Sequence, residues 1–158
     1  MKSILVLILI TLIPTLELRA SIPFGILKGD MSWWVVVLVC LATNIVLGPL
    51  VYLFLDKVVF LLLRFERLNR IYQQTVERTQ RRIQRPVEKY GEIGLAFFIG
   101  IPLPGTGSYT GALGAYLIGL GYRKFIVANV IGVLIAGAIV TAIMLSGMEA
   151  FRILIKAG

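Results

Sequence analysis

Two uninterrupted apolar runs constrain this chain more than any other feature of its sequence. The first extends from about Trp33 to Leu55 and the second from about Phe125 to Met148. Each is as long as the roughly twenty apolar residues that a helix needs to cross the hydrocarbon core of a bilayer. The 158 residues are 58% hydrophobic and only 15% charged, which is far from the composition of a soluble domain. We therefore expect an all-α integral membrane protein.

Two further apolar segments are each broken near the middle by prolines and polar residues. The first begins at Ser3 and is interrupted over residues 14–23, and the second, residues 91–120, is interrupted over residues 102–110. About ten to fourteen apolar residues on either side of a break suit a re-entrant hairpin better than a full span. Non-helical backbone at membrane depth must be buried in protein or line a wet cavity, because unpaired backbone groups there cost several kcal/mol.

The two halves of the chain have the same order of features. In each, a broken segment is followed by a short charged turn and then by an uninterrupted run that holds an asparagine, Asn44 or Asn129, shortly before a glycine. Matching broken segments in two halves are typical of an inverted repeat with a binding site between the halves. We predict a single membrane domain of residues 1–158, in which residues 1–63 form the first repeat, 64–90 a connector and 91–158 the second repeat.

Two topologies distribute the charges almost equally well. If each broken segment dips into the membrane and returns to the same side, eleven cations lie inside and four outside. If each broken segment crosses, twelve lie inside and three outside. The excess of cations in cytoplasmic loops cannot choose between these topologies. The need to cover the broken backbone favours the re-entrant one.

The connector, residues 64–90, is the strongly polar part of the chain. Nine of the sixteen cations and three of the eight anions lie between Lys57 and Lys89. Apolar residues recur there at helical spacing, so we predict a basic amphipathic helix on the cytoplasmic surface that ends before Pro86. We assign the net charge of +8 to cytoplasmic loops rather than to nucleic-acid binding, with anionic-lipid binding as the alternative role of the connector.

The composition also excludes several chemistries. The chain has no histidine, which removes Ser-His-Asp and Cys-His catalysis and histidine-bearing metal sites. The single cysteine, Cys40, lies in an apolar run, so no intramolecular disulfide can form and a buried thiol is expected. We therefore expect neither an enzyme nor a resident metal or cofactor.

A charged pair, Glu17 and Arg19, lies within the first break. A charge at membrane depth costs at least about 2.5–3.5 kcal/mol and usually faces a pathway and a partner. Two residues apart on one helix, the side chains would point to different faces, but at a break bracketed by Pro14 and Pro23 they can converge. We interpret Glu17 as a proton acceptor and Arg19 as an anion binder. A structural ion pair that locks the loop, or snorkelling at an interface, is the alternative.

The second break combines residues that stop a helix with residues that can satisfy its freed backbone groups. Its candidate site residues are Pro102, Pro104, Gly105, Thr106, Gly107, Ser108 and Thr110. Exposed amides at the start of the following half-helix would form an anion site at the positive end of the helix dipole. Glu92, at the mouth of this hairpin, is either a second titratable site residue or a helix-start carboxylate. Asn44 and Asn129 are expected to bridge helices, with contact to substrate as the lesser alternative.

These two breaks resemble the signature regions of a known family. Residues 14–23 and 101–107 look like those of the small multidrug export protein family, a prokaryotic membrane group, and the second half is more distantly similar to DedA/VTT membrane proteins. The resemblance implies two re-entrant loops in an inverted repeat and, for DedA relatives, proton-coupled movement of lipid-linked phosphates such as polyprenyl phosphate. DedA-type second loops carry arginines around the proline, whereas here Arg19 is the one arginine at membrane depth.

Together, the residues and the resemblance predict a DedA-like multi-pass transporter of the cell membrane. Its expected partners are membrane lipids and a lipid-linked or amphipathic, phosphate-bearing substrate held between the two loops, with proton coupling. The alternatives are an exporter of cationic amphiphiles and a non-transporting scaffold or assembly protein. Because two spans and two hairpins enclose little volume, we also expect a homodimer or a higher homo-oligomer.

Overall fold

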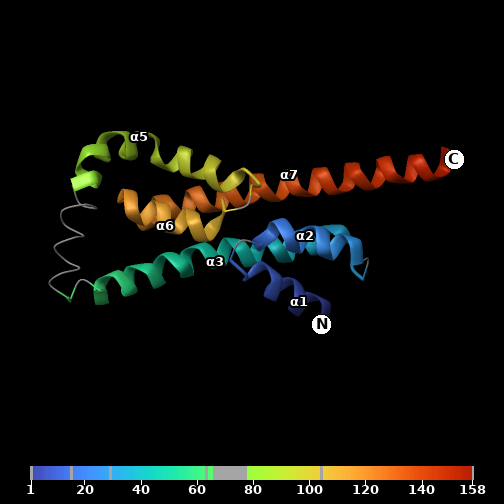
Figure 1. Cartoon of the computed structure of the whole chain (residues 1–158), viewed down its shortest axis with the longest axis horizontal. Helices are drawn as coiled ribbons and strands as arrows, with labels where there is room; N and C mark the ends of the chain where they lie inside the picture. Colours follow the sequence, from blue (N-terminus) through green and yellow to red (C-terminus); the bar gives the residue numbers. More distant parts are fainter. Residues whose placement is uncertain are drawn as a thin grey trace.

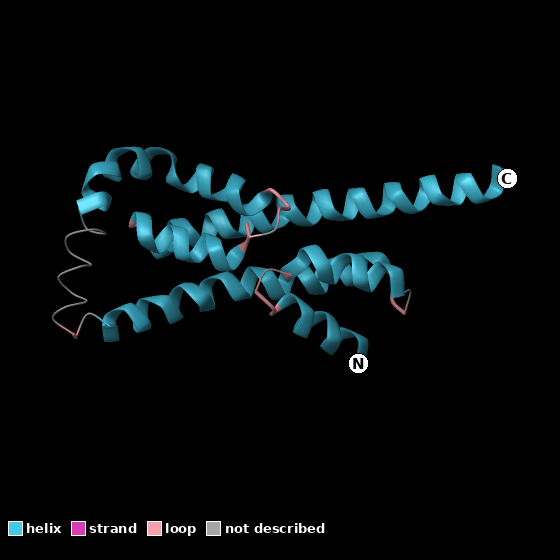
Figure 2. Ribbon diagram, in the orientation of Figure 1, coloured by secondary structure: helices cyan, strands magenta, loops and turns pink. Residues whose placement is uncertain are grey.

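The computed structural model describes residues 2–14, 16–28, 30–62, 64–65, 78–103 and 105–157, with the side chains of residues 62, 78–88 and 149–157 left aside. In these residues all regular secondary structure is helical, as predicted (Figure 2). The helices are α1 (Lys2–Thr11), α2 (Glu17–Lys28), α3 (Trp33–Leu62), α5 (Arg78–Gly100), α6 (Ser108–Ile118) and α7 (Tyr122–Ala157) (Figure 1).

Helices α3 and α7 form the long axis of the molecule. They lie side by side and run in opposite directions (Figure 1). Among the described residues, their segments Trp33–Leu61 and Tyr122–Met148 are the two that are long and apolar enough to cross a membrane. This confirms two helices able to span a membrane at the predicted places, and both helices extend beyond the apolar runs that predicted them.

The four shorter helices form two hairpins, α1 with α2 and α5 with α6. The turn between α1 and α2 and the loop between α5 and α6 meet near the middle of the long axis (Figure 1). The hydroxyl of Tyr109 in α6 donates to the carbonyl of Leu12 in the first turn at 2.6 Å. The two breaks in the sequence therefore lie together in space.

The first hairpin begins and ends on the same side of the molecule. Ser3 in α1 donates a hydrogen bond to Asp30 Oδ2 at 3.1 Å, and Lys28 Nζ lies 3.0 Å from the same oxygen. The hydrogen bond from Lys28, with that from Ser3, holds the pKa of the Asp30 carboxyl below its ordinary value. The start of α1 and the end of α2 are thus neighbours.

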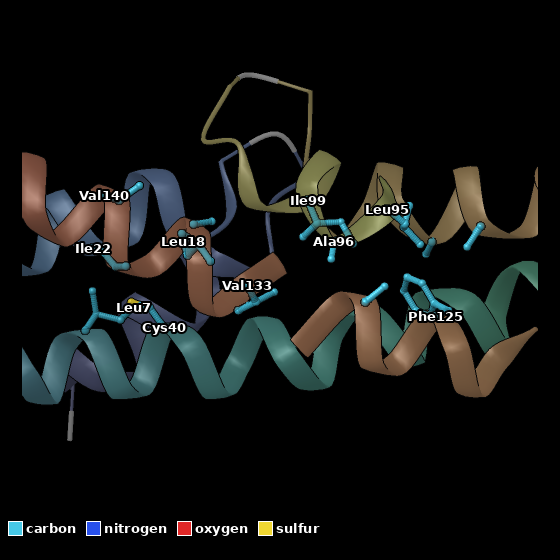
Figure 3. Close-up of a cluster of buried hydrophobic side chains, with 14 of the residues drawn as sticks. Leu7, Leu18, Ile22, Cys40, Leu95, Ala96, Ile99, Phe125, Val133 and Val140 are labelled. Atoms are coloured by element: carbon cyan, nitrogen blue, oxygen red, sulfur yellow. The ribbon is translucent and has the colours of Figure 1, made fainter. Parts of the chain in front are cut away.

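A continuous apolar core lies between the helices (Figure 3). Leu7, Ile22 and Val140 are buried at one end, and Phe125 is buried at the other. Cys40 is also fully buried and free, which confirms the expected thiol. This core joins both hairpins to both long helices.

Glycine allows the closest approach within this core. A Cβ atom on Gly132 of α7 would lie 2.6 Å from Ile99 Cβ and 2.8 Å from the Ala96 carbonyl oxygen of α5. Real Cβ atoms do not approach other heavy atoms this closely, so α5 and α7 could not pack here with a larger residue. Small residues at helix crossings bring membrane helices together in this way.

Two predicted helix boundaries are wrong. The first break is only the short turn before Glu17, so Pro23 lies inside α2 rather than in a loop. Helix α5 runs through Pro86, where we predicted an end. A proline removes one backbone hydrogen bond and bends a helix without always ending it, and α5 bends in its first part (Figure 1). Residues 66–77 of the predicted connector lie outside the described residues.

The Gly132 contact gives a test of the packing. Gly132→Ala should destabilise the protein by about 1–3 kcal/mol, because the added methyl group overpacks the α5–α7 crossing. The matched control is Gly94→Ala in α5, where an added Cβ meets nothing within 4 Å. The control should be neutral or more stable by up to about 1 kcal/mol, since alanine favours a helix. Unfolding of both variants in detergent, followed by circular dichroism, measures the difference, and equal midpoints would contradict this packing.

Candidate functional site

The two loops meet at a buried group of polar atoms that we call the ion-pair cluster. It comprises the side chains of Glu17 and Arg19 in α2, Asn44 in α3 and Thr106 in the second loop, together with the first amides of α6. The Glu17 side chain is only 3% exposed. Sequence analysis predicted each of these four side chains as a site residue, and the structure brings all four together.

Glu17 supplies the N-terminal cap of α6. The amide of Ser108 donates to Glu17 Oε2 at 3.1 Å, and the amide of Tyr109 donates to Oε1 at 3.2 Å. The first amides of a helix have no partner within the helix, and a negative charge there also complements the helix dipole. The predicted anion site at the start of α6 therefore exists, but the carboxylate of Glu17 fills it.

Glycine at the cap position makes room for this carboxylate. Gly107 precedes α6 and has no side chain to cap the helix, and a Cβ atom there would collide with both carboxylate oxygens of Glu17. The amide of Gly107 is satisfied locally, because it donates to Thr110 Oγ1 at 3.0 Å. Thr110 thus satisfies a freed backbone group, as predicted.

Arg19 binds the end of α5 and the second loop, whereas Glu17 binds the start of α6. Its Nη1 lies 3.4 Å from Glu17 Oε2, and its Nη2 donates to Thr106 Oγ1 at 2.9 Å and to the Ile101 carbonyl at 3.0 Å. The carbonyl of Ile99 is also within 3.3 Å of Nη2. These carbonyls lie at the C-terminal, negative end of α5, where a cation is favourable. Its contacts are therefore those of a loop-locking ion pair, the alternative that the sequence left open.

The two asparagines bridge helices, as predicted. Asn44 Nδ2 donates to Glu17 Oε2 at 3.2 Å and thereby joins α3 to α2. Asn129 Nδ2 donates to the Ile45 carbonyl at 3.3 Å and joins α7 to α3. Asn44 is 1% exposed and Asn129 is fully buried. The first of these bridges belongs to the ion-pair cluster, whereas the second lies beside it on α3.

The backbone at Glu17 is strained. Among the described residues it is the one non-glycine residue with a positive φ, at 43°. A side chain in this left-handed region costs of order 1–3 kcal/mol and persists only where its surroundings determine the conformation. The amides of α6 and the side chain of Asn44 are those surroundings.

The second loop makes further polar contacts of its own. The Thr106 hydroxyl lies 2.6 Å from the Ile101 carbonyl and 2.9 Å from that of Leu103, and Ser108 Oγ lies 3.5 Å from the Asn44 carbonyl. Gly105 adopts φ 83° in the loop that also holds Pro102. Pro104 lies outside the described residues.

Two predicted site residues lie away from the cluster. Pro23 is inside α2, and Glu92 is well inside α5, so Glu92 is not a helix-start carboxylate. In the part of the chain that the structure describes, Glu92 has no hydrogen-bond or ion-pair partner. Conversely, the carbonyls of Ile99 and Ile101, which accept hydrogen bonds from Arg19, were not predicted, because backbone carbonyls give no sequence signal.

Two apolar helices able to span a membrane, with a charged cluster packed among the helices, are the features of a small helical membrane protein. Within the described residues no three His, Cys, Asp or Glu side chains gather as a metal site. Residues 17–139 match the model of the family described as "Putative small multi-drug export protein", and this chain belongs to that family. No curated protein and no solved structure matches it. The match begins at Glu17 and includes the whole ion-pair cluster.

The cluster predicts that the two ion pairs of the described residues contribute very differently to the free energy of unfolding. Glu17→Gln should lower the free energy of unfolding by about 2–4 kcal/mol, because it leaves Arg19, whose side chain is only 12% exposed, without its counter-ion. Asp30→Asn breaks the exposed pair with Lys28 and should leave the unfolding midpoint almost unchanged. Titration of both variants with a denaturing detergent tests this. A Glu17→Gln midpoint as close to wild type as that of Asp30→Asn would contradict the cluster's role.

Proposed function

We propose that the protein exports amphipathic molecules across the cell membrane, without covalent chemistry, along a path that is closed where the two loops meet. One observation carries the proposal: Glu17 in the first hairpin caps α6 in the second hairpin, so a single buried carboxylate joins the two. The chain belongs to a family that is described by multi-drug export, which supports outward transport and an amphipathic substrate class. Separation of the two loops would open the path.

We also propose that both hairpins are re-entrant. The apolar part of α3 between Trp34 and Asp56 is about 33 Å long at 1.5 Å per residue, which matches a hydrocarbon core of about 30 Å. Asn44 lies near the middle of this segment and binds Glu17, so the ion-pair cluster would be near mid-membrane. Helix α1 has 10 residues and α6 has 11, enough for about 15–17 Å, or half the bilayer.

The two hairpins then enter from opposite sides, as in an inverted repeat. The contact of Ser3 with Asp30 supports one side for both ends of the first hairpin. The contact of the Tyr52 and Tyr122 rings, 5.4 Å apart, supports a common opposite side for Lys57 and Arg123. With the basic residues 64–90 joined to that side, we assign it to the cytoplasm.

A proton is the simplest coupling ion for such a path. Separation of the loops would remove the α6 amides from Glu17 and leave a bare carboxylate at membrane depth, which is very unfavourable. Protonation would neutralise that carboxylate and allow the loops to part. We therefore propose that Glu17 is the proton acceptor of the transport cycle, with Arg19 as the group that recloses the path.

Transport in liposomes tests this function. Wild-type protein should move a fluorescent cationic amphiphile in response to a pH gradient, whereas Glu17→Gln and Arg19→Gln should lower the rate at least about tenfold. Asp30→Asn should transport as wild type does, because its ion pair lies at the far end of α2. Equal rates in all variants would contradict the proposal, and no transport by any of them would favour a scaffold.

Labelling of single cysteines from one side of the membrane tests the topology. In a Cys40→Ala background, Lys2→Cys and Lys28→Cys should react with an impermeant maleimide on one side, and Lys57→Cys and Arg123→Cys on the other. If the broken segments crossed the membrane instead, Lys2→Cys and Lys28→Cys would react on opposite sides.

The homo-oligomer expected from the size of the chain remains our proposal. Cross-linking in native membranes would detect a dimer.

A further inference from the structure

The side chain of Asn44 has one hydrogen-bonding group that this structure does not use. Its Nδ2 donates to Glu17 Oε2 at 3.2 Å, whereas its Oδ1 is buried and has no hydrogen-bond partner among the described residues. The whole residue is only 1% exposed. Buried polar atoms are almost always hydrogen-bonded, so an unpaired amide oxygen beside a carboxylate calls for an explanation.

Every group that contacts the Glu17 carboxylate faces it with a donor. Oε2 accepts hydrogen bonds from the Ser108 amide and from Asn44 and lies 3.4 Å from Arg19 Nη1, and Oε1 accepts from the Tyr109 amide. Four donors suit the ionised carboxylate, which only accepts hydrogen bonds. A protonated carboxyl group carries an O–H of its own and needs an acceptor for it.

Asn44 is the one of these four groups that can turn an acceptor toward the carboxyl group. The two backbone nitrogens can only donate, and the guanidinium of Arg19 has no acceptor. A half-turn about the last bond of the asparagine side chain exchanges its oxygen with its NH2 group, which fills nearly the same space. With the exchange, only the NH2 group is left without a partner. Without it, both Oδ1 and the O–H of the acid would be unpaired.

Few other ionisable groups lie near this carboxyl group. Arg19 is its one ion-pair partner among the described residues, and α3 contacts it through the neutral Asn44. The α6 helix contacts it through backbone amides, and the Tyr109 hydroxyl of that helix donates to the first turn instead. The thiol of Cys40, one turn earlier on α3, lies by hydroxyl groups of the first hairpin.

We propose that Asn44 is the positioning residue for protonation of Glu17. Its Nδ2 donates to the ionised carboxylate, as observed. When a proton from the solution binds Oε2, the amide makes a half-turn, the hydrogen bond from Nδ2 breaks, and the new O–H donates to Oδ1. The unpaired oxygen of this structure is thus the acceptor that the neutral acid needs.

The role of that proton in export rests on the proposed function. Glu17 and Asn44 lie in α2 and α3, whereas the amides that cap onto the carboxylate lie in α6. The hydrogen bond between Asn44 and Glu17 can therefore persist when the two loops part. It would keep the neutral acid paired at membrane depth, where an unpaired O–H is costly.

Infrared difference spectroscopy of the reconstituted protein tests the proposal. Acidification should produce the C=O band of a protonated carboxyl group, and Glu17→Gln should remove it. In Asn44→Leu the band should move to higher frequency, because the O–H loses its acceptor. The matched control is Asn129→Leu, which should keep the wild-type frequency. Asn129 is also buried, bridges two helices through Nδ2 and has an unpaired Oδ1, but its partner is the Ile45 carbonyl rather than a carboxyl group.

A second measurement uses the wild-type protein with isotope-labelled asparagine. Acidification should move one asparagine C=O band to lower frequency, because Asn44 Oδ1 becomes hydrogen-bonded. The shift should persist in Asn129→Leu, so this measurement decides the proposal even where Asn44→Leu does not fold. If Asn44→Leu folds, it should lack the shift and transport about two- to tenfold more slowly, the effect of one hydrogen bond.

Three outcomes would overturn the proposal: no acid band from Glu17, an acid band at the same frequency in wild type and Asn44→Leu, or an asparagine band that does not move. Failure of the proposed function is distinguishable from these. Both band shifts without transport in liposomes would contradict export and leave the role of Asn44 intact. Transport that depends on Glu17 without the band shifts would contradict the role of Asn44 alone.

Discussion

The carboxylate of Glu17 holds this structure together, because the amides that it caps belong to a helix on the other side of the molecule. The α6 helix begins after a glycine that cannot cap it, and the missing acceptor comes from α2, 91 residues earlier in the chain. Arg19 repeats the arrangement with opposite charge at the end of α5. Each side chain thus complements the dipole of one arm of the second hairpin.

In the re-entrant topology that we propose, this arrangement solves the main difficulty of a broken helix in a membrane. Loop backbone at membrane depth must find partners inside the protein. Here the Arg19 guanidinium binds the carbonyls and the Glu17 carboxylate binds the amides, so the two charges and the two backbone ends neutralise each other. The same contacts close the space between the hairpins. In the transport cycle that we propose, a change at either of these two charges would open the path.

Much of this arrangement could be predicted from the sequence. The two long apolar runs predicted α3 and α7, and the prolines and glycines after Ile101 predicted the second loop, because several of them close together disfavour a helix more than a single one does. The convergence of Glu17 and Arg19 was predicted from a helix break, and Glu17 does begin α2 with a positive φ. What occupied the anion site at the start of α6 could not be predicted, since the sequence does not show which backbone lies opposite a carboxylate.

Single prolines were poor markers of the helix ends. Pro23 lies inside α2 and Pro86 inside α5, because one missing hydrogen bond bends a helix without always ending it. The length of the first turn was therefore overestimated.

The distance between the two loops tests the central claim most directly. Nitroxide labels at Leu12→Cys and Leu103→Cys, in a Cys40→Ala background, report that distance by pulsed electron paramagnetic resonance. With Glu17 present we expect one short and narrow distance distribution, and with Glu17→Gln a longer and broader one, while Asp30→Asn leaves it unchanged. An identical distribution with and without the Glu17 carboxylate would contradict the claim that this group holds the hairpins together.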